Sequence, residues 1–324
     1  MLGTKATWIL TAAIVLGIWA GPAQSQALSK RPITLIVVQP AGSAVDVITR
    51  LYADAVSKSL GQAIVVDNRP GGGGVIGLQN LKQSAPDGTT LVVTANGPLT
   101  IAPWMRKLPY DVNDDFEIVA TLFGFLQFLT VSAESPATSI ASLISYAKEK
   151  PGGLTYSSLG VGSITHLLCA WVGKDSGTVM QHAPYNSTAQ YLLDIATNRI
   201  DFTFASYQST NSLWHDKKIK YLATTSAARS PLTPDVPTTA EAGFPKLRYG
   251  VWFALLAPKG TPAAIVDKLN EQFQQVSLDQ QILQRLTREG IEAMITTPTE
   301  AKAMVTSEST VMKKLADEFG LAGK

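Results

Sequence analysis

The feature that most constrains the fold of this 324-residue chain is an alternation of short apolar runs with helix-like segments. The run ITLIVV (33–38) predicts a buried strand. The segment after it, ending near Gly61, predicts a helix with Val47, Ile48, Leu51 and Ala55 on one face. The pattern continues with four further predicted strands, AIVVDN, TTLVVTAN, FEIVATLF and FLQFLTVSA. The alternation starts again at LTYSS, after the turn Pro151-Gly152-Gly153. This alternation predicts an α/β protein, and its restart predicts two α/β lobes.

The two lobes are expected to share the chain unequally. We expect residues 28–127 and 251–324 to form lobe 1 and residues 128–250 to form lobe 2. A strand pair near 118–132 and 250–257 should cross between them, and the stretch from Pro262 to Gly290 should be one long helical region. A chain of this length commonly divides into two domains.

The N-terminus has the layout of a secretory signal peptide in residues 1–27. Lys5 precedes an apolar stretch from Trp8 to Ala20, and a small-residue region follows, with cleavage expected near Ser25 to Ala27. The alternative is a membrane anchor, but the stretch is shorter than the roughly 20 apolar residues that span a bilayer. The mature chain is therefore expected outside the cytoplasm.

Charge and cysteine content exclude several classes of protein. The formal charge is +2, and removal of the signal takes away one lysine and no acid. Nucleic-acid binding needs clustered Lys and Arg, so no nucleic-acid partner is expected. The single cysteine, Cys169, cannot form an intrachain disulfide, and its apolar neighbours predict an inert buried thiol.

The turn QPAGSAVD, which follows the first strand, combines a helix start with a possible anion site. Ser43 and Asp46 match the Ser-x-x-Asp capping pattern before an apolar helical periodicity. The plain interpretation is a well-capped helix. The functional one is that unpaired first-turn N–H groups and the helix dipole accept a carboxylate that small residues allow to approach.

Similar strand-to-helix turns recur along the chain. A helix is expected from about Ile164, after the turn in LTYSSLGVGSITH. A second helix is expected after QHAPYNSTAQ, with a capping box of Ser187 and Gln190. A third strand, RIDFTFAS, ends in hydroxyl residues. Ligands of open α/β sheets bind beyond the carboxyl ends of strands. Converging neutral turns from two lobes would therefore clamp an anion or a polar solute.

Catalytic and cofactor motifs are absent from the sequence. There is no phosphate loop, no dinucleotide-binding G-x-G-x-x-G, no G-x-S-x-G elbow and no metal-ligand spacing among the three histidines. No cofactor or metal is expected. A secreted hydrolase using Ser163 and His166 is the enzymatic alternative, although two residues three apart on one helix are not a triad arrangement.

Taken together, these segments resemble the Bug family, the extracytoplasmic receptors of tripartite tricarboxylate transporters. The similarity rests on LGQAIVVDNRPGGGGVIG, APDGTTLVV, GGLTYSSLGVGSITHL, HAPYNSTAQYLLDIATNRIDF and WFALLAPKGTPAAIVDKLN, in order along nearly the whole mature chain. The resemblance implies a type II periplasmic binding protein fold, with a ligand cleft between two lobes joined by two crossing strands. It also implies a monomeric, non-enzymatic periplasmic receptor that delivers a small carboxylate (a di-, tri- or aromatic carboxylate, or an acidic amino acid) to membrane subunits. An orphan receptor for a membrane signalling partner would share this fold.

The resemblance also implies which residues touch the ligand. Gln39 stands where the family usually has an aromatic residue, Ser43 where it has glycine, and Val161 where a polar residue is common. Asn186-Ser187 replaces a frequent Lys-Gly, and Ala205-Ser206-Tyr207 stands where an acidic or amide side chain is often found. The expected ligand-binding residues are Gln39, Pro40, Ala41, Gly42, Ser43, Ala44, Asp46, Gly162, Ser163, Thr165, His166, Tyr185, Ser206 and Tyr207.

Overall fold

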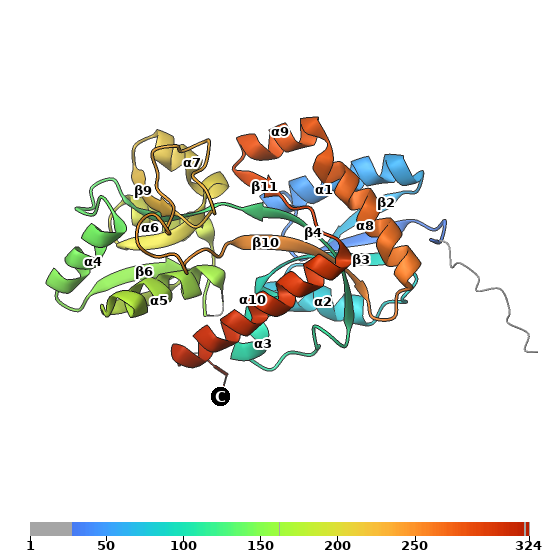
Figure 1. Ribbon diagram of the computed structural model, residues 1–324, viewed down its shortest axis with the longest axis horizontal. Coiled ribbons are helices and arrows are strands. Elements are labelled where there is room, and N and C mark those ends of the chain that lie inside the picture. The colour runs from blue at the N-terminus through green and yellow to red at the C-terminus, as the bar shows by residue number, and fades with distance from the viewer. Residues whose placement is uncertain (1–27, 162, 321, 324) are drawn as a thin grey trace, which may run out of the picture.

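A computed structural model describes residues 28–161, 163–320 and 322–323, and it shows two mixed sheets with helices on their faces (Figure 1). The expected α/β architecture with two lobes is confirmed. The predicted signal peptide and Gly162 lie outside the described residues. No helix among the described residues is long and apolar enough to cross a membrane.

Lobe 1 is built on a six-stranded sheet with the strand order β11-β4-β10-β3-β1-β2. β1, β2 and β3 are parallel, and β10 is antiparallel to both β3 and β4. The strands are β1 (Ile33–Val37), β2 (Ile64–Asn68), β3 (Thr90–Ala95), β4 (Phe116–Phe125), β10 (Val251–Pro258) and β11 (Ile291–Ala293). The helices are α1 (Ala44–Leu60), α2 (Val75–Lys82), α3 (Ala102–Met105), α8 (Ala263–Leu278), α9 (Gln280–Arg288) and α10 (Pro298–Glu318), with a short 3-10 turn at Gly72–Gly74 and a π turn at Gly97–Ile101.

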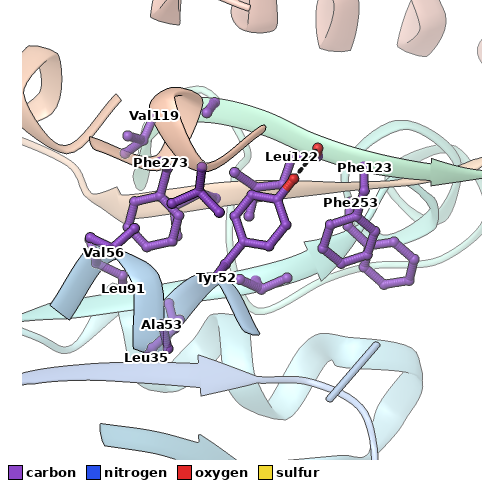
Figure 2. Close-up of a cluster of buried hydrophobic side chains, with 14 of the residues drawn as sticks. Leu35, Tyr52, Ala53, Val56, Leu91, Val119, Leu122, Phe123, Phe253 and Phe273 are labelled. Atoms are coloured by element: carbon purple, nitrogen blue, oxygen red, sulfur yellow. Dashed lines mark hydrogen bonds between the residues drawn. The ribbon is translucent and has the colours of Figure 1, made fainter. Parts of the chain in front are cut away.

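One face of this sheet is covered by α1 and α8, which enclose an aromatic-rich core (Figure 2). Phe123 and Phe253 stack with their ring centroids 5.2 Å apart, and Tyr52 donates a hydrogen bond to the carbonyl of Leu122 at 3.3 Å. The inner face of α1 carries Val45, Ile48 and Tyr52. The expectation that Val47 lies on that face was wrong, because its side chain is 42% exposed.

Lobe 2 is built on a five-stranded sheet with the order β7-β6-β8-β5-β9. Its strands are β5 (Gln127–Ser132), β6 (Leu154–Ser158), β7 (Met180–Pro184), β8 (Phe202–Ser206) and β9 (Ile219–Thr224). Its helices are α4 (Ile140–Glu149), α5 (Ile164–Ser176), α6 (Thr188–Ala196) and α7 (Tyr207–His215). Cys169 is fully buried on α5, and burial raises the pKa of its thiol, so the prediction of an inert thiol agrees with its position.

The predicted crossing strands join the two sheets. β4 ends at Phe125 and β5 begins at Gln127, so the first crossing takes place at Leu126. For the return crossing, the N–H of Thr225 bonds to the carbonyl of Gln127 at 2.9 Å, and Val251 pairs with Phe125. The two connections therefore lie side by side.

The last helix, α10, packs against both lobes (Figure 1). Ala301 and Val305, in its first half, lie in a lobe 1 cluster with Leu256. Met312 and Leu315, in its second half, lie in the main core cluster of lobe 2. We retain the lobe limits given above as a proposal, with the addition that α10 contributes to both cores.

The stretch from Pro262 to Gly290 is helical, as expected, but it consists of two helices. α8 and α9 are separated at Asp279, which has an extended backbone conformation. The carboxylate of Asp279 accepts hydrogen bonds from the N–H groups of Gln281 and Ile282 and so caps a new helix.

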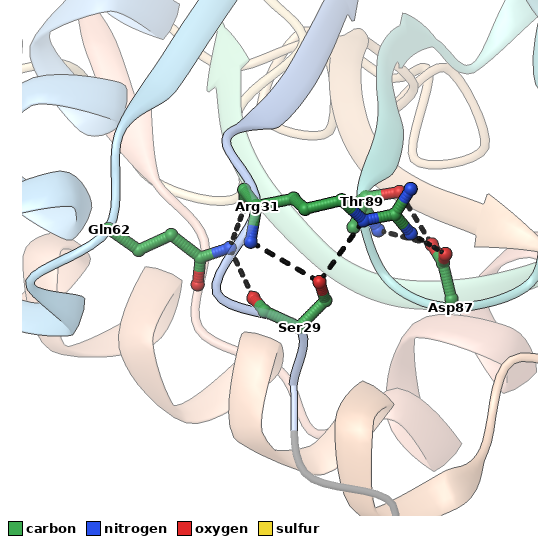
Figure 3. Close-up of polar contacts among 5 residues, drawn as sticks. All are labelled: Ser29, Arg31, Gln62, Asp87 and Thr89. Carbon is green, nitrogen blue, oxygen red and sulfur yellow. Dashed lines mark hydrogen bonds and ion pairs between the residues drawn. The ribbon is translucent and has the colours of Figure 1, made fainter.

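Polar contacts fix the start of the described chain to the amino edge of the lobe 1 sheet (Figure 3). Arg31 forms an ion pair with Asp87, and Gln62 donates to the carbonyl of Ser29 at 2.7 Å. This edge lies opposite the carboxyl ends of β1 and β3.

Candidate functional site

The carboxyl edges of both sheets face the junction between the lobes. In lobe 1, β3 and β4 are both antiparallel to β10, so β4 runs parallel to β3 and to β1. The chain leaves lobe 1 at the carboxyl end of β4. In lobe 2, Gln127 at the start of β5 pairs with Ser206 at the end of the antiparallel β8. The ends of β1 and β3 therefore point towards lobe 2, and those of β6, β7 and β8 point towards lobe 1.

Each edge has a topological switch point, where ligands of open α/β sheets bind. In lobe 1 the chain goes from β1 outward to β2 and then returns past β1 to β3. In lobe 2 it goes from β6 to β7 and then returns past β6 to β8. The turns after β1 and β6, selected from the sequence, lie at these two switch points.

The turn after β1 presents unpaired N–H groups at the start of α1. Ser43 caps the helix, since its hydroxyl accepts from the N–H of Asp46 at 3.3 Å. Gly42 has a φ of +78°, which favours glycine. Among the described residues, the N–H groups of Ala44 and Val45 have no hydrogen-bond partner. Pro40, Ala41 and Gly42 are exposed, so this helix end is open to solvent.

Asp46 holds this turn in shape. The expected capping box is altered, because the carboxylate accepts from the N–H of Gly42 at 2.9 Å instead of from that of Ser43. It also accepts from Asn68 at 2.8 Å and from Arg50 at 3.1 Å. Burial by itself would raise the pKa of Asp46, but these hydrogen bonds outweigh it and leave the pKa below its ordinary value. The side chain is only 3% exposed, so Asp46 supports the turn from behind.

The turn after β6 has nearly the same geometry. Ser163 has an extended backbone like that of Ser43, and its hydroxyl accepts from the N–H of His166 at 3.2 Å. It also donates to the carbonyl of Gly160 at 2.8 Å and lies 3.1 Å from the Thr165 hydroxyl. The N–H groups of Ile164 and Thr165 have no partner among the described residues. Two similar helix ends are thus presented, one by each lobe.

The other predicted turns contribute in different ways. Ser206 caps α7 and lies at the edge, paired with Gln127. The Tyr185 hydroxyl donates to Asp194 at 2.6 Å, and burial together with that carboxylate raises the pKa of Tyr185 to about 12. The predicted capping box of Ser187 and Gln190 was wrong, because the Ser187 side chain caps nothing. Tyr207 is 5% exposed and packs in a lobe 2 cluster with Phe128.

His166 lies in a stack of rings directly behind the second turn. Its ring centroid is 4.2 Å from that of His182, which is in turn 5.1 Å from that of Tyr156. Nε2 of His182 lies 2.7 Å from the Ser158 hydroxyl, whereas Nδ1 of His166 is buried without a hydrogen-bond partner. Burial and the neighbouring His182 lower the pKa of His166 to about 4, so the ring is neutral at pH 7.

This arrangement does not favour hydrolysis. The bonds that the structure gives the Ser163 hydroxyl go to Gly160, Thr165 and the backbone of His166, so no ring nitrogen activates it. Within the described part of the chain there is no cluster of three or more potential metal ligands.

A buried polar network that no sequence motif indicates lies behind the carboxyl edge of the lobe 1 sheet. The carboxylate of Glu308 accepts from the indole N–H of Trp252 at 2.7 Å and from Asn96 at 2.8 Å. It also accepts from the Thr100 hydroxyl at 2.8 Å, while Asn96 donates to the carbonyl of Gly250 at 3.0 Å. Asn96 follows β3 directly, so this network joins the ligand edge, the return crossing and α10. The partners are up to 212 residues apart in sequence, and no local pattern indicates them.

Comparisons with known proteins show the family of this chain. Residues 48–321 match the model of the tripartite tricarboxylate transporter family receptor. A protein of Pseudomonas sp. (strain P51), encoded in the tcbD-tcbE intergenic region, is 32% identical over 296 residues, which is 91% of this chain and 88% of the relative.

Two solved structures share the fold and were determined with carboxylates. Rpa4515 of R. palustris with adipate has a TM-score of 0.81 at 31% identity and covers 91% of this chain and 99% of its own. MatC (Rpa3494) of Rhodopseudomonas palustris with bound malate has a TM-score of 0.76 at 27% identity and covers 88% and 98%.

Proposed function

Because this chain belongs to the receptor family of tripartite tricarboxylate transporters, we propose that it captures a small organic carboxylate between its lobes and delivers it to the membrane subunits of such a transporter. The family is one of periplasmic solute-binding proteins, and its members with adipate and malate have this fold. The single observation that carries the proposal is the pair of capped, open helix ends at the two facing switch points.

Unpaired N–H groups at a helix start favour negative charge. Each first turn carries about half a positive elementary charge, and its N–H groups can bond directly to carboxylate oxygens. Among the described residues, one pair of such N–H groups belongs to Ala44 and Val45 and the other belongs to Ile164 and Thr165. A dicarboxylate could bond to both lobes at once and would favour their closure, as in other two-lobed binding proteins.

We propose separate roles for the expected site residues. The turn from Gln39 to Ala44 and the turn from Gly162 to Thr165 contact the ligand, with Tyr185 and Ser206 beside the second. Asp46 and His166 act from behind their turns, as their burial indicates. Tyr207 acts through packing, because its ring lies in the core of lobe 2.

A ligand screen tests the proposed function. The chain from residue 28 onward should be stabilised against heat by one or more mono-, di- or tricarboxylates and should release no product from them. Sugars and cationic amines serve as the control set. Stabilisation by members of the control set, without stabilisation by any carboxylate, would contradict the proposal.

A further inference from the structure

We propose that the ligand is a carboxylate that carries no polar or charged group apart from its carboxylates, so that the rest of the molecule is apolar. Leu159 and Val161 select this ligand by apolar contact. This inference rests on the proposed function, which it narrows from carboxylates in general to one chemical class. The candidates that it sets aside are tricarboxylates, amino acids and hydroxy acids.

The four turns at the facing edges of the two sheets carry almost no side-chain charge. Residues 39–46, 159–166, 184–190 and 205–209 contain no lysine or arginine, and Asp46 is their one carboxylate. The Asp46 carboxylate already binds Arg50 and Asn68. The nearby Asp194 is likewise occupied by Tyr185 and Arg199.

A ligand with further charges would therefore lack partners. The helix ends can each offset one carboxylate, but the turns hold no cation for a third. An ammonium group would need a free carboxylate, and Asp46 and Asp194 are both occupied. Glu292 lies outside these turns, in a groove at the crossing that Arg248, of opposite charge, also lines. Burial of an unpaired charge is costly, so citrate-like and amino-acid ligands are disfavoured.

The turn after β6 in lobe 2 also presents an apolar surface. Leu159 and Val161 flank Gly160, and their side chains are 49% and 66% exposed. β6 runs parallel to β8 and pairs with it through Tyr156 and Phe202. Gly160 and Ser206 each lie four residues beyond this pair, so they are at the same level of the sheet. Ser206 in turn pairs with Gln127 at the crossing into lobe 1. These two aliphatic side chains thus lie at the edge that faces lobe 1. They offer apolar contact and no hydrogen bond to a hydroxyl group on the ligand.

Calorimetric titration of the chain from residue 28 onward tests this inference with a series of dicarboxylates. Affinity should rise from butanedioate to hexanedioate by up to about fourfold per added methylene, because each buried methylene contributes roughly that factor. Malate, aspartate and citrate should bind no more tightly than butanedioate. Tighter binding of any of these three than of hexanedioate would overturn the inference while leaving the proposed function intact.

A matched pair of variants tests the role of Val161. Val161→Asn should weaken hexanedioate binding by about four- to sixteenfold, the loss expected for one to two buried methyl groups. Val179→Asn is the control, since Val179 is 67% exposed but lies just before β7, at the far edge of the same sheet. Equal affinities of the two variants would refute selection by Val161. Absence of binding by every carboxylate would instead refute the proposed function.

Discussion

Three serine residues show how single side chains shape the carboxyl edges of the two sheets. Ser43, Ser163 and Ser206 have similar extended backbones, and each hydroxyl accepts from the N–H three residues ahead. Each serine hydroxyl therefore satisfies one of the N–H groups at the start of its helix. After Ser43 and Ser163 the two N–H groups before that donor have no partner among the described residues, whereas after Ser206 the N–H of Tyr207 donates to the carbonyl of Leu126. A hydroxyl does this without adding charge, so no formal charge of the capping side chain offsets the partial positive charge of the helix start.

At the same scale, His166 should make stability depend on pH. Its pKa is about 4 in the folded chain, against an ordinary value of about 6.5. Between these values the unfolded chain binds a proton that the folded chain does not, so the free energy of unfolding falls as the pH falls from 6.5 to 4. We expect a loss on the order of 2 kcal/mol from this residue.

Urea denaturation at a series of pH values measures this effect. His166→Phe should show a smaller loss over the same range, whereas His215→Gln, at the exposed end of α7, should behave like the unaltered chain. An unchanged pH dependence in His166→Phe would contradict the assignment.

At the scale of elements, α10 is joined to the sheet of lobe 1 by a buried carboxylate. Glu308 is 6% exposed and accepts three hydrogen bonds, from β10, from Asn96 and from the π turn that follows it. Burial raises the pKa of Glu308 above its ordinary value. Because these donors are themselves buried, their bonds to Glu308 fix the position of α10 against β10.

Removal of this carboxylate should destabilise the protein strongly. Glu308→Ala leaves the indole of Trp252, Asn96 and Thr100 without their acceptor, and we expect a loss of about 2–4 kcal/mol in the free energy of unfolding. Glu300→Ala, in the exposed capping box of the same helix, should cost about 1 kcal/mol. Chemical denaturation measures both, and similar losses in the two variants would argue against the network.

At the scale of the whole molecule, the lobes share a helix as well as two connections. The core cluster of lobe 2 contains Met312 and Leu315 of α10, together with Ile101 from the π turn of lobe 1. Lys174 on α5 also donates to the backbone carbonyl of Glu318 at 2.6 Å. Motion of one lobe relative to the other must therefore preserve these contacts or move α10.

The shared helix predicts that the two lobes unfold together. Met312→Ala, at a side chain that is 1% exposed, should lower the free energy of unfolding by about 2–5 kcal/mol. Native-state hydrogen exchange should show equal losses of protection in β1 and in β6. A loss confined to β6 and its neighbours would show instead that the lobes unfold independently.

Features that depend on residues close together in the sequence were predicted, and features that depend on contacts between distant residues were not. Strands, crossings and the turns at 39–46 and 159–166 are encoded by local periodicity and by capping residues, and they were predicted. The helical character of residues 262–290 was predicted, but the place of the break at Asp279 was not, because the residues around it are compatible with a continuous helix. The burial of Tyr207, the sharing of α10 and the Glu308 network depend on residues far apart in the chain, which no short segment reveals.

The position of α10 also affects the order in which the protein can fold. Residues 298–318 are synthesised after every strand of both sheets, yet they complete the cores of both lobes. A growing chain on the ribosome therefore lacks part of each hydrophobic core until α10 has been made. The strands of both sheets must therefore wait for α10 before either core is complete.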